Sequence, residues 1–283
     1  MLSLVVLALA GTPLATGHSS PVPAPTSSAL ACDLVPHATA EPAAAGVAPT
    51  VSVAAASDLR YAMEDLVATF EALDPDQSVA VTYGSSGNFF AQISQGAPFD
   101  VYFSADIDYP RALEEAGLAA PDTTRLYAEG RIVTWVRDAS PIDIVGLGVS
   151  AVLDPAVGRV AIANPEHAPY GRAAQSALEA AGVWEEVQPR IVLGENISQA
   201  AQFVESGAAD IGILALSLAI APPLCHEGRY ALVPQELHPP IDQGAVVLAA
   251  AADPAAATAF LGFVLGPTGR EVLDRYGFLL PEG

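Results

Sequence analysis

Short apolar segments alternate with helical segments along most of this 283-residue chain, and this alternation limits the folds that it can adopt. Residues 51–56 suit a buried strand, and from Leu59 apolar residues recur at the spacing of an amphipathic helix. The same order returns at 79–83, and the pattern also predicts a loop at 128–130 and a helix that starts at Arg172. Strands that alternate with helices predict an α/β fold whose mainly parallel sheets are flanked by helices.

A small or hydroxyl residue stands where several predicted strands end and the next helix begins. The four places are Ser57, Ser85-Ser86, Tyr170-Gly171 and Asn196-Ile197. The first turn of a helix presents free backbone N–H groups and a partial positive charge, so it holds an anion without a cationic side chain. Because ligands of open α/β sheets lie at the carboxyl ends of strands, the pattern favours one anion-binding crevice.

The charge of the chain decides what kind of anion site is to be expected. The formal net charge is −21, and the 11 basic residues are all Arg. Nucleic acid is not expected as a partner, because its phosphate backbone requires basic patches. The negative field of the protein opposes anion capture at long range, so the site must act through short-range dipoles.

The first 49 residues differ from the rest of the chain. Residues 1–10 have the length and apolarity of a signal-peptide hydrophobic region, although no basic residue precedes them. Residues 17–50 are rich in Ser, Pro and Ala without periodicity, which is typical of a disordered leader. We therefore assign 1–49 to a signal-like segment and a leader.

The two cysteines, Cys32 and Cys225, leave three alternatives open. Residues 29–32 resemble a lipoprotein processing site, which would anchor the protein to the outer face of the membrane through Cys32. The second alternative is a disulfide between the two cysteines, and the third is two unpaired thiols. The first two place the protein outside the cytoplasm.

Six blocks of the sequence, in this order, resemble those of the molybdate/tungstate-binding proteins of ABC importers. The blocks are 54–57, 83–87, 96–106, 164–171, 195–197 and 210–213. The resemblance covers about 50–283 and implies a type II periplasmic binding protein fold, with a ligand cleft between two α/β lobes. Lobe one would comprise 50–130 plus 244–283, and lobe two 131–243. It implies a monomer that delivers its ligand to a membrane permease and an ATPase.

The resemblance also implies which residues hold the oxyanion. The matching positions are the hydroxyls of Ser57 and Ser86 and the backbone N–H groups of Tyr170 and Ile197. Ser85 and Asp58 are additional candidates, although we expect the Asp58 side chain to point away from an anion. Some relatives add a Tyr hydroxyl where this chain has Ala215, and the Tyr170 hydroxyl is a candidate replacement.

Elementary chemistry agrees with such a site, because a fully ionised dianion accepts hydrogen bonds and donates none. No catalysis and no cofactor are expected, and the metal would be present only as molybdate held through its oxygens. Alternatives remain: Ser57 and Ser86 also fit helix N-caps, and sulfate or phosphonate also fits a donor-only site. A hydrolase is the less favoured alternative, because residues 84–87 do not form a Gly-x-Ser-x-Gly nucleophile elbow.

Overall fold

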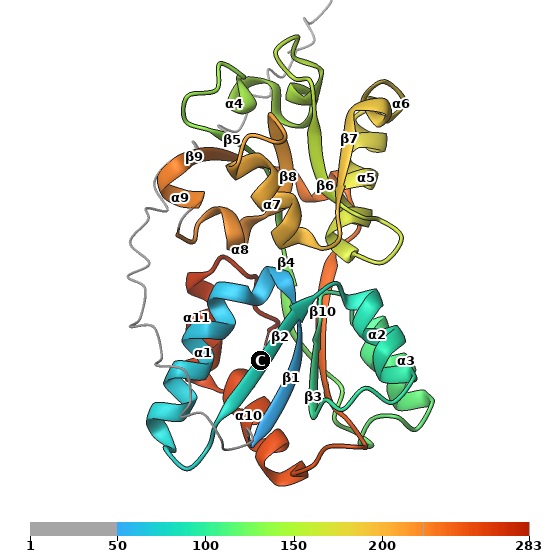
Figure 1. Ribbon diagram of the computed structural model, residues 1–283, viewed down its shortest axis with the longest axis vertical. Helices are drawn as coiled ribbons and strands as arrows, with labels where there is room; N and C mark the ends of the chain where they lie inside the picture. The colour runs from blue at the N-terminus through green and yellow to red at the C-terminus, as the bar shows by residue number, and fades with distance from the viewer. Residues whose placement is uncertain (1–49, 223, 283) are drawn as a thin grey trace, which may run out of the picture.

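Within residues 50–222 and 224–282, which the computed structural model describes, ten strands form two five-stranded sheets, one in each of two lobes (Figure 1). The lobes are stacked along the long axis of the molecule, and helices flank both sheets. The predicted α/β two-lobed fold is therefore confirmed. The predicted signal-like segment and leader lie outside the described residues.

The sheet of lobe one has the strand order β2-β1-β3-β10-β4. Its strands are β1 Val51–Ala56, β2 Val79–Gly84, β3 Val101–Ser104, β4 Arg125–Gly130 and β10 Ile241–Val247. β1 pairs in parallel with β2 and β3, and β10 pairs antiparallel with β3 and β4. The loop predicted at 128–130 is wrong, because β10 pairs with these residues from a distant part of the sequence.

The sheet of lobe two has the order β7-β6-β8-β5-β9. Its strands are β5 Ile132–Arg137, β6 Val160–Ala163, β7 Ile191–Gly194, β8 Ile211–Ala215 and β9 Gly228–Leu232. β6 pairs in parallel with β7 and β8, and β5 pairs antiparallel with β8 and β9. Each sheet is therefore mixed, with a single strand opposed to the others.

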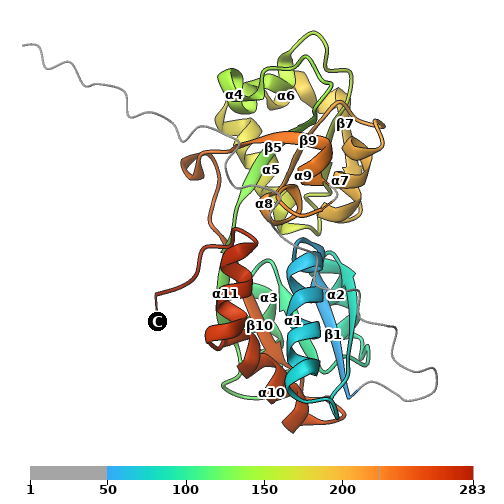
Figure 2. The same cartoon turned by 90° about the vertical axis from the view of Figure 1, so that its left-hand side faces the viewer.

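The opposed strand of each sheet is the one that the chain enters directly from the other lobe. The chain crosses from β4 to β5 at Arg131, and it returns from β9 to β10 through residues 233–240. These two connections lie side by side between the lobes in both views (Figures 1 and 2).

Alternate residues of the lobe-one strands face different helices, as the two-residue period of a strand requires. Val101 and Phe103 pack in the cluster that contains α1, α10 and α11, whereas Tyr102 packs in the cluster that contains α2 and α3. The helices of this lobe are η1 Ser57–Leu59 (a 3₁₀ turn), α1 Arg60–Leu73, α2 Ser86–Ser94, α3 Asp108–Glu115, α10 Pro254–Leu265 and α11 Pro267–Arg275.

Most of the remaining helices belong to lobe two. They are α4 Ile144–Leu147, α5 Pro169–Ala180, α6 Trp184–Val187, α7 Ile197–Glu205, α8 Leu216–Ala219 and α9 Leu224–Glu227. Three 3₁₀ turns, η2 Gly148–Leu153, η3 Gln188–Arg190 and η4 Gln235–Leu237, complete the described helical segments. α5 starts at Pro169 and not at Arg172, because proline fits the first position of a helix. Tyr170 therefore lies in the first turn of α5.

Three further observations concern the cysteines, membrane-spanning helices and the charges on the surface. Cys225 in α9 is disulfide-bonded, so the alternative of two unpaired thiols is wrong, and Cys32 lies outside the described residues. No helix in the described part of the chain has the length and apolarity needed to cross a membrane.

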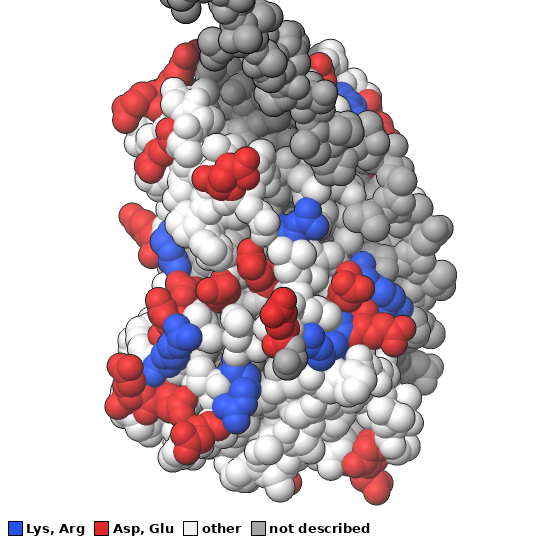
Figure 3. Space-filling model, turned by 180° about the vertical axis from the view of Figure 1, so that it is seen from behind, with Lys and Arg blue, Asp and Glu red and all other residues white. Residues whose placement is uncertain are grey.

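On the face shown in Figure 3, arginines lie among acidic side chains, so charges of both signs alternate there.

Candidate functional site

A small pocket between the lobes brings together all six residues that the sequence singled out. Its lining consists of Ala56, Ser57, Asp58, Gly84, Ser85, Ser86, Ala105, Ala168, Pro169, Tyr170 and Ile197. The first seven belong to lobe one and the last four to lobe two. No Arg or His is among these lining residues, and Asp58 is the one charged residue among them.

Four helix starts meet at this pocket. Ser57 is the first residue of η1, Ser86 the first of α2, and Ile197 the first of α7. Tyr170 is the second residue of α5. Backbone N–H groups in a first turn have no acceptor within their own helix, and the helix dipole makes this end positive. Both lobes thus present neutral donors to the same small volume.

Ser86 accepts a buried hydrogen bond at the edge of the pocket. Its Oγ accepts from the backbone N–H of Ala105 at 2.9 Å, and this bond does not use the hydroxyl hydrogen. Its side chain makes no cap bond, because the N-cap position of α2 belongs to Ser85. The alternative that Ser86 is an N-cap is therefore wrong.

Ser57 is held more loosely than Ser86. Its Oγ accepts only a long hydrogen bond of 3.4 Å, from the backbone N–H of Ser198 across the interface. The hydroxyl of Ser198 donates in turn to the backbone carbonyl of Ser57 at 2.9 Å. No side-chain cap bond is made at the start of η1, so the capping alternative is wrong for Ser57 as well.

Ser85 occupies the N-cap position of α2 but makes no side-chain cap bond. Its Oγ lies 2.8 Å from Nδ1 of His167, on the loop before α5, and the adjacent backbone N–H of Gly87 donates to the His167 carbonyl at 2.9 Å. Ser85 therefore lines the pocket while its hydroxyl is paired across the lobe interface.

Asp58 is 1% exposed, and its carboxylate is directed into the interface. Oδ2 accepts hydrogen bonds from Nε2 of Gln243 at 2.7 Å and from the Tyr170 hydroxyl at 3.0 Å, whereas Oδ1 has no partner. Burial raises the pKa of Asp58 from 3.8 to about 6, because loss of hydration outweighs the hydrogen bonds from Gln243 and Tyr170.

The prediction that the Tyr170 hydroxyl replaces the missing tyrosine at position 215 does not fit this geometry. That hydroxyl donates to Asp58 and accepts from Gln243 at 3.0 Å, so the backbone N–H of Tyr170 is what remains for a ligand. Ala215 ends β8 as a buried residue, and the nearby Ser217 donates to the backbone carbonyl of Asp58 at 2.7 Å.

Sequence reasoning missed Gln243 and Ser217. Gln243 is fully buried in β10, and Ser217 is buried in α8. A glutamine within an otherwise apolar strand is a weak local signal, and a serine in a short helix gives none. Their shared partner, Asp58, is more than 100 residues away from each of them, which no local pattern contains.

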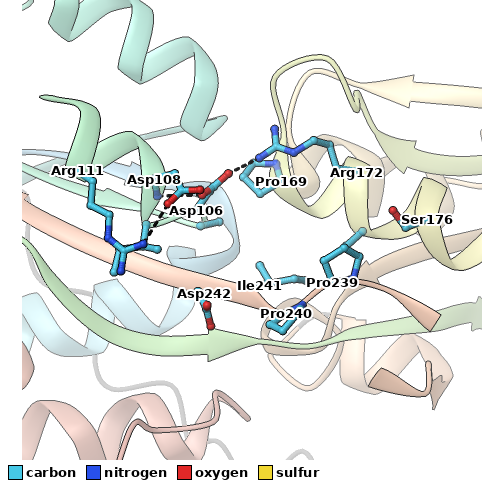
Figure 4. A pocket seen from close by; sticks show the side chains of 13 residues that line it. Asp106, Asp108, Arg111, Pro169, Arg172, Ser176, Pro239, Pro240, Ile241 and Asp242 are labelled. Atoms are coloured by element: carbon cyan, nitrogen blue, oxygen red, sulfur yellow. Dashed lines mark hydrogen bonds and ion pairs between the residues drawn. The ribbon is translucent and has the colours of Figure 1, made fainter. Parts of the chain in front are cut away.

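A larger interlobe cavity of about 440 Å³ is less suited to an anion. Figure 4 shows the Arg172 and Arg111 side chains in its wall, each directed at a carboxylate. Arg172 pairs with Asp106 across the interface, and Arg111 pairs with Asp108 at 3.1 Å. Because its cations are paired and a further aspartate, Asp242, also lines it, this cavity does not match the donor-only chemistry of the smaller pocket. The described residues contain no cluster of His, Cys, Asp and Glu that could hold a metal ion.

The sequence of the chain resembles those of known proteins over most of its length. Residues 51–279 match the family model of bacterial extracellular solute-binding proteins. The molybdate-binding protein ModA of Rhodobacter capsulatus is 39% identical over 84% of this chain and 90% of its own length. The ModA of Azotobacter vinelandii is 37% identical over 83% and 92%, respectively.

Solved structures give the same result. The periplasmic molybdate-binding protein of Azotobacter vinelandii superposes with a TM-score of 0.77 at 32% identity, covering 82% of this chain and 100% of that chain. The sulfate-binding protein SubI of Mycobacterium tuberculosis shares the fold alone, with a TM-score of 0.66 at 18% identity over 82% and 86% of the two chains. The chain therefore belongs to the bacterial extracellular solute-binding protein family.

Proposed function

We propose that the protein captures molybdate, and also tungstate, outside the cytoplasm and delivers it to the permease and ATPase of an ABC importer. The observation that carries this proposal is the pocket at four helix starts, which offers neutral donors from both lobes and no cation among its lining residues. The names of the relatives at 37–39% identity support molybdate as the ligand.

In this proposal the Ser57 and Ser86 hydroxyls and the backbone N–H groups of Tyr170 and Ile197 donate to the oxygens of the anion. Each hydrogen bond to a charged group is worth roughly 1.5–3 kcal/mol, and part of this gain is spent on closing the lobes. The sum is consistent with a dissociation constant below about 1 μM. The protein itself catalyses no reaction; its mechanism is closure of two lobes on one dianion.

Selectivity in such a pocket has two physical sources. Hydrogen phosphate carries an O–H that needs an acceptor, and a site made of donors leaves it unpaired. Sulfate is also a tetrahedral dianion without a hydrogen, so it must be distinguished by its smaller size. We propose the two crossings, at Arg131 and at 233–240, as the hinge of closure, and a monomer as the functional unit.

Isothermal titration calorimetry with molybdate, tungstate, sulfate and phosphate tests the proposal. We expect tight binding of the first two anions and weak or undetectable binding of phosphate. Tight sulfate binding without heat from molybdate would instead identify a sulfate-binding protein, which is the main alternative.

Attachment to the cell surface is a separate part of the proposal. Cys225 is disulfide-bonded, and Cys32 is the only other cysteine of the sequence. The sulfur atom of Cys32 cannot carry a lipid and form a disulfide with Cys225 at the same time, so the two alternatives exclude each other within one chain. Mass spectrometry of the mature protein, with and without reduction, distinguishes a lipid-modified N-terminal cysteine from a disulfide. We expect the disulfide.

A further inference from the structure

Asp58 receives hydrogen bonds from two separate elements of lobe two, although it belongs to lobe one. The Tyr170 hydroxyl on α5 donates to Oδ2 of Asp58 at 3.0 Å, and the Ser217 hydroxyl on α8 donates to its backbone carbonyl at 2.7 Å. Asp58 directly follows Ser57, a proposed ligand, and the backbone N–H of Tyr170 is another. Each bond therefore ties the position of a ligand group to the position of the opposite lobe.

The hydrogen bonds around Asp58 have a defined direction. The Tyr127 hydroxyl donates to Oε1 of Gln243, so the amide nitrogen of Gln243 faces Asp58 and Tyr170. Nε2 then donates to Asp58 at 2.7 Å and to the Tyr170 hydroxyl at 3.0 Å, which uses both of its hydrogens. The Tyr170 hydroxyl hydrogen is left for Asp58. These four side chains are at most 2% exposed.

This network lies against both connections between the lobes. Gln243 is in β10, directly after the chain returns to lobe one, and Gly130 is the last residue of β4 before the chain leaves it. A Cβ atom at Gly130 would overlap the Tyr170 hydroxyl and would contact Nε2 of Gln243 at 2.8 Å. The absence of a side chain at Gly130 thus leaves the space that the Tyr170 hydroxyl occupies.

Other side-chain contacts between the lobes are more exposed to water. Asn88 donates to Glu195 at 2.8 Å in an exposed position. The Arg172–Asp106 pair has side chains that are 40% and 27% exposed. Water and salt screen such contacts, and exposed ion pairs contribute little. A buried hydrogen bond to a carboxylate contributes more, because breaking it leaves a desolvated charge with one donor fewer.

We propose that Asp58 is a positioning residue for ligand binding: it accepts the Tyr170 hydroxyl when the lobes close and so holds the start of α5 against the captured anion. This inference rests on the proposed function. The side chain of Asp58 does not touch the ligand. It acts through Tyr170, whose backbone N–H is the ligand group, and opening of the lobes breaks the bond.

The deciding variant is Tyr170→Phe, which retains the ring and the backbone N–H but removes the hydroxyl. We expect molybdate to bind about tenfold more weakly, since a hydrogen bond to a charged group is lost in the closed state alone. The loss should lie in faster dissociation, measured by stopped-flow tryptophan fluorescence, because the bond exists only after closure. Small-angle X-ray scattering should show a larger radius of gyration for the variant at subsaturating molybdate.

The matched control is Tyr276→Phe. The Tyr276 hydroxyl donates to Oδ2 of Asp65 at 3.0 Å, and both residues are buried within lobe one. This control removes the same kind of hydrogen bond of the same length without crossing the interface. It should lower the unfolding temperature but leave molybdate affinity within about twofold, because the bond is present in open and closed states alike.

A second set of variants makes the test independent of how well Tyr170→Phe folds. Asp58→Asn retains an oxygen that accepts from Tyr170, so it should keep affinity within about threefold, whereas Asp58→Ala should lose about tenfold. The double variant Asp58→Ala/Tyr170→Phe should lose no more than either single one, because both remove the same bond.

The inference is overturned if Tyr170→Phe binds and releases molybdate as the wild type does, or if Tyr276→Phe weakens binding equally. It is also overturned if losses of Asp58→Ala and Tyr170→Phe add. Failure of the proposed function is a different outcome: the wild type then gives no heat with molybdate. In that case the same comparison is made with whichever of tungstate and sulfate gives heat, and equal affinities of the wild type and Tyr170→Phe for that anion overturn the inference.

Discussion

Replacing Ser86 by alanine separates what its hydroxyl does for the fold from what it does for the ligand. The hydroxyl accepts the buried backbone N–H of Ala105 at 2.9 Å, and in the proposed site its hydrogen is donated to the anion. Ser86→Ala removes both interactions. Ser57→Ala removes only a 3.4 Å contact with the backbone N–H of Ser198 in addition to its proposed ligand bond.

The two losses have different magnitudes and different assays. Loss of a hydrogen bond to a charged ligand costs about 1.5–3 kcal/mol, which corresponds to about 10- to 150-fold weaker binding in calorimetric titration with molybdate. Ser86→Ala also leaves the backbone N–H of Ala105 without its acceptor, which should lower the free energy of unfolding, measured with urea, by roughly 1–3 kcal/mol. Ser57→Ala should weaken binding similarly but lower stability by less than about 1 kcal/mol, because its remaining contact is long.

Ser94→Ala is the control, because Ser94 is exposed at the end of the same helix as Ser86. It reports the small effect of helix propensity alone. If Ser57→Ala and Ser86→Ala each bind molybdate within about twofold of the wild type, the hydroxyls are not ligands and the reasoning fails. If Ser86→Ala weakens binding without loss of stability, the structural role assigned to the Ala105 bond is wrong.

Three further predictions concern the interface. Burial raises the pKa of Asp58 from 3.8 to about 6, so the contribution of Asp58 to stability is fully present below pH 3.8 and is lost as the pH rises through about 6. Asp58→Asn should therefore raise the free energy of unfolding at pH 7 by up to about 3 kcal/mol. Urea unfolding at about pH 5 and pH 7 should show that the free energy of unfolding depends less on pH in the variant than in the wild type. Gly130→Ala would displace the Tyr170 hydroxyl, so calorimetry should show about tenfold weaker molybdate binding and the unfolding temperature should fall; unchanged values would contradict the packing described here. The partly exposed pair of Arg172 and Asp106 should matter little: Asp106→Asn is expected to change affinity by less than about fivefold, and titration at high salt should abolish the difference.

Much of the site was predictable because its proposed donors are local features of the chain. A strand that ends in Ser57 or Ser86 and continues as a helix has free N–H groups at that point, whatever the rest of the molecule does. The same holds for Ile197, although Asn196 caps that helix through its side chain and accepts from the backbone N–H of Gln199 at 3.1 Å. Tyr170 lines the pocket, and its role as a backbone donor stays a prediction, whereas its hydroxyl is paired with Asp58 and Gln243.

The sequence by itself determined the class of fold, the order of most strands and helices, and the helix starts that line the pocket. These follow from hydrophobic periodicity and from capping and turn residues, which act over a few neighbouring positions. The tertiary structure alone decided that β4 pairs with β10, that Asp58 meets Tyr170 across the interface, and that Gln243 orients both. Segments far apart in the sequence supply these contacts, and the strength of the contacts comes from burial, which exists only once the two lobes have packed together.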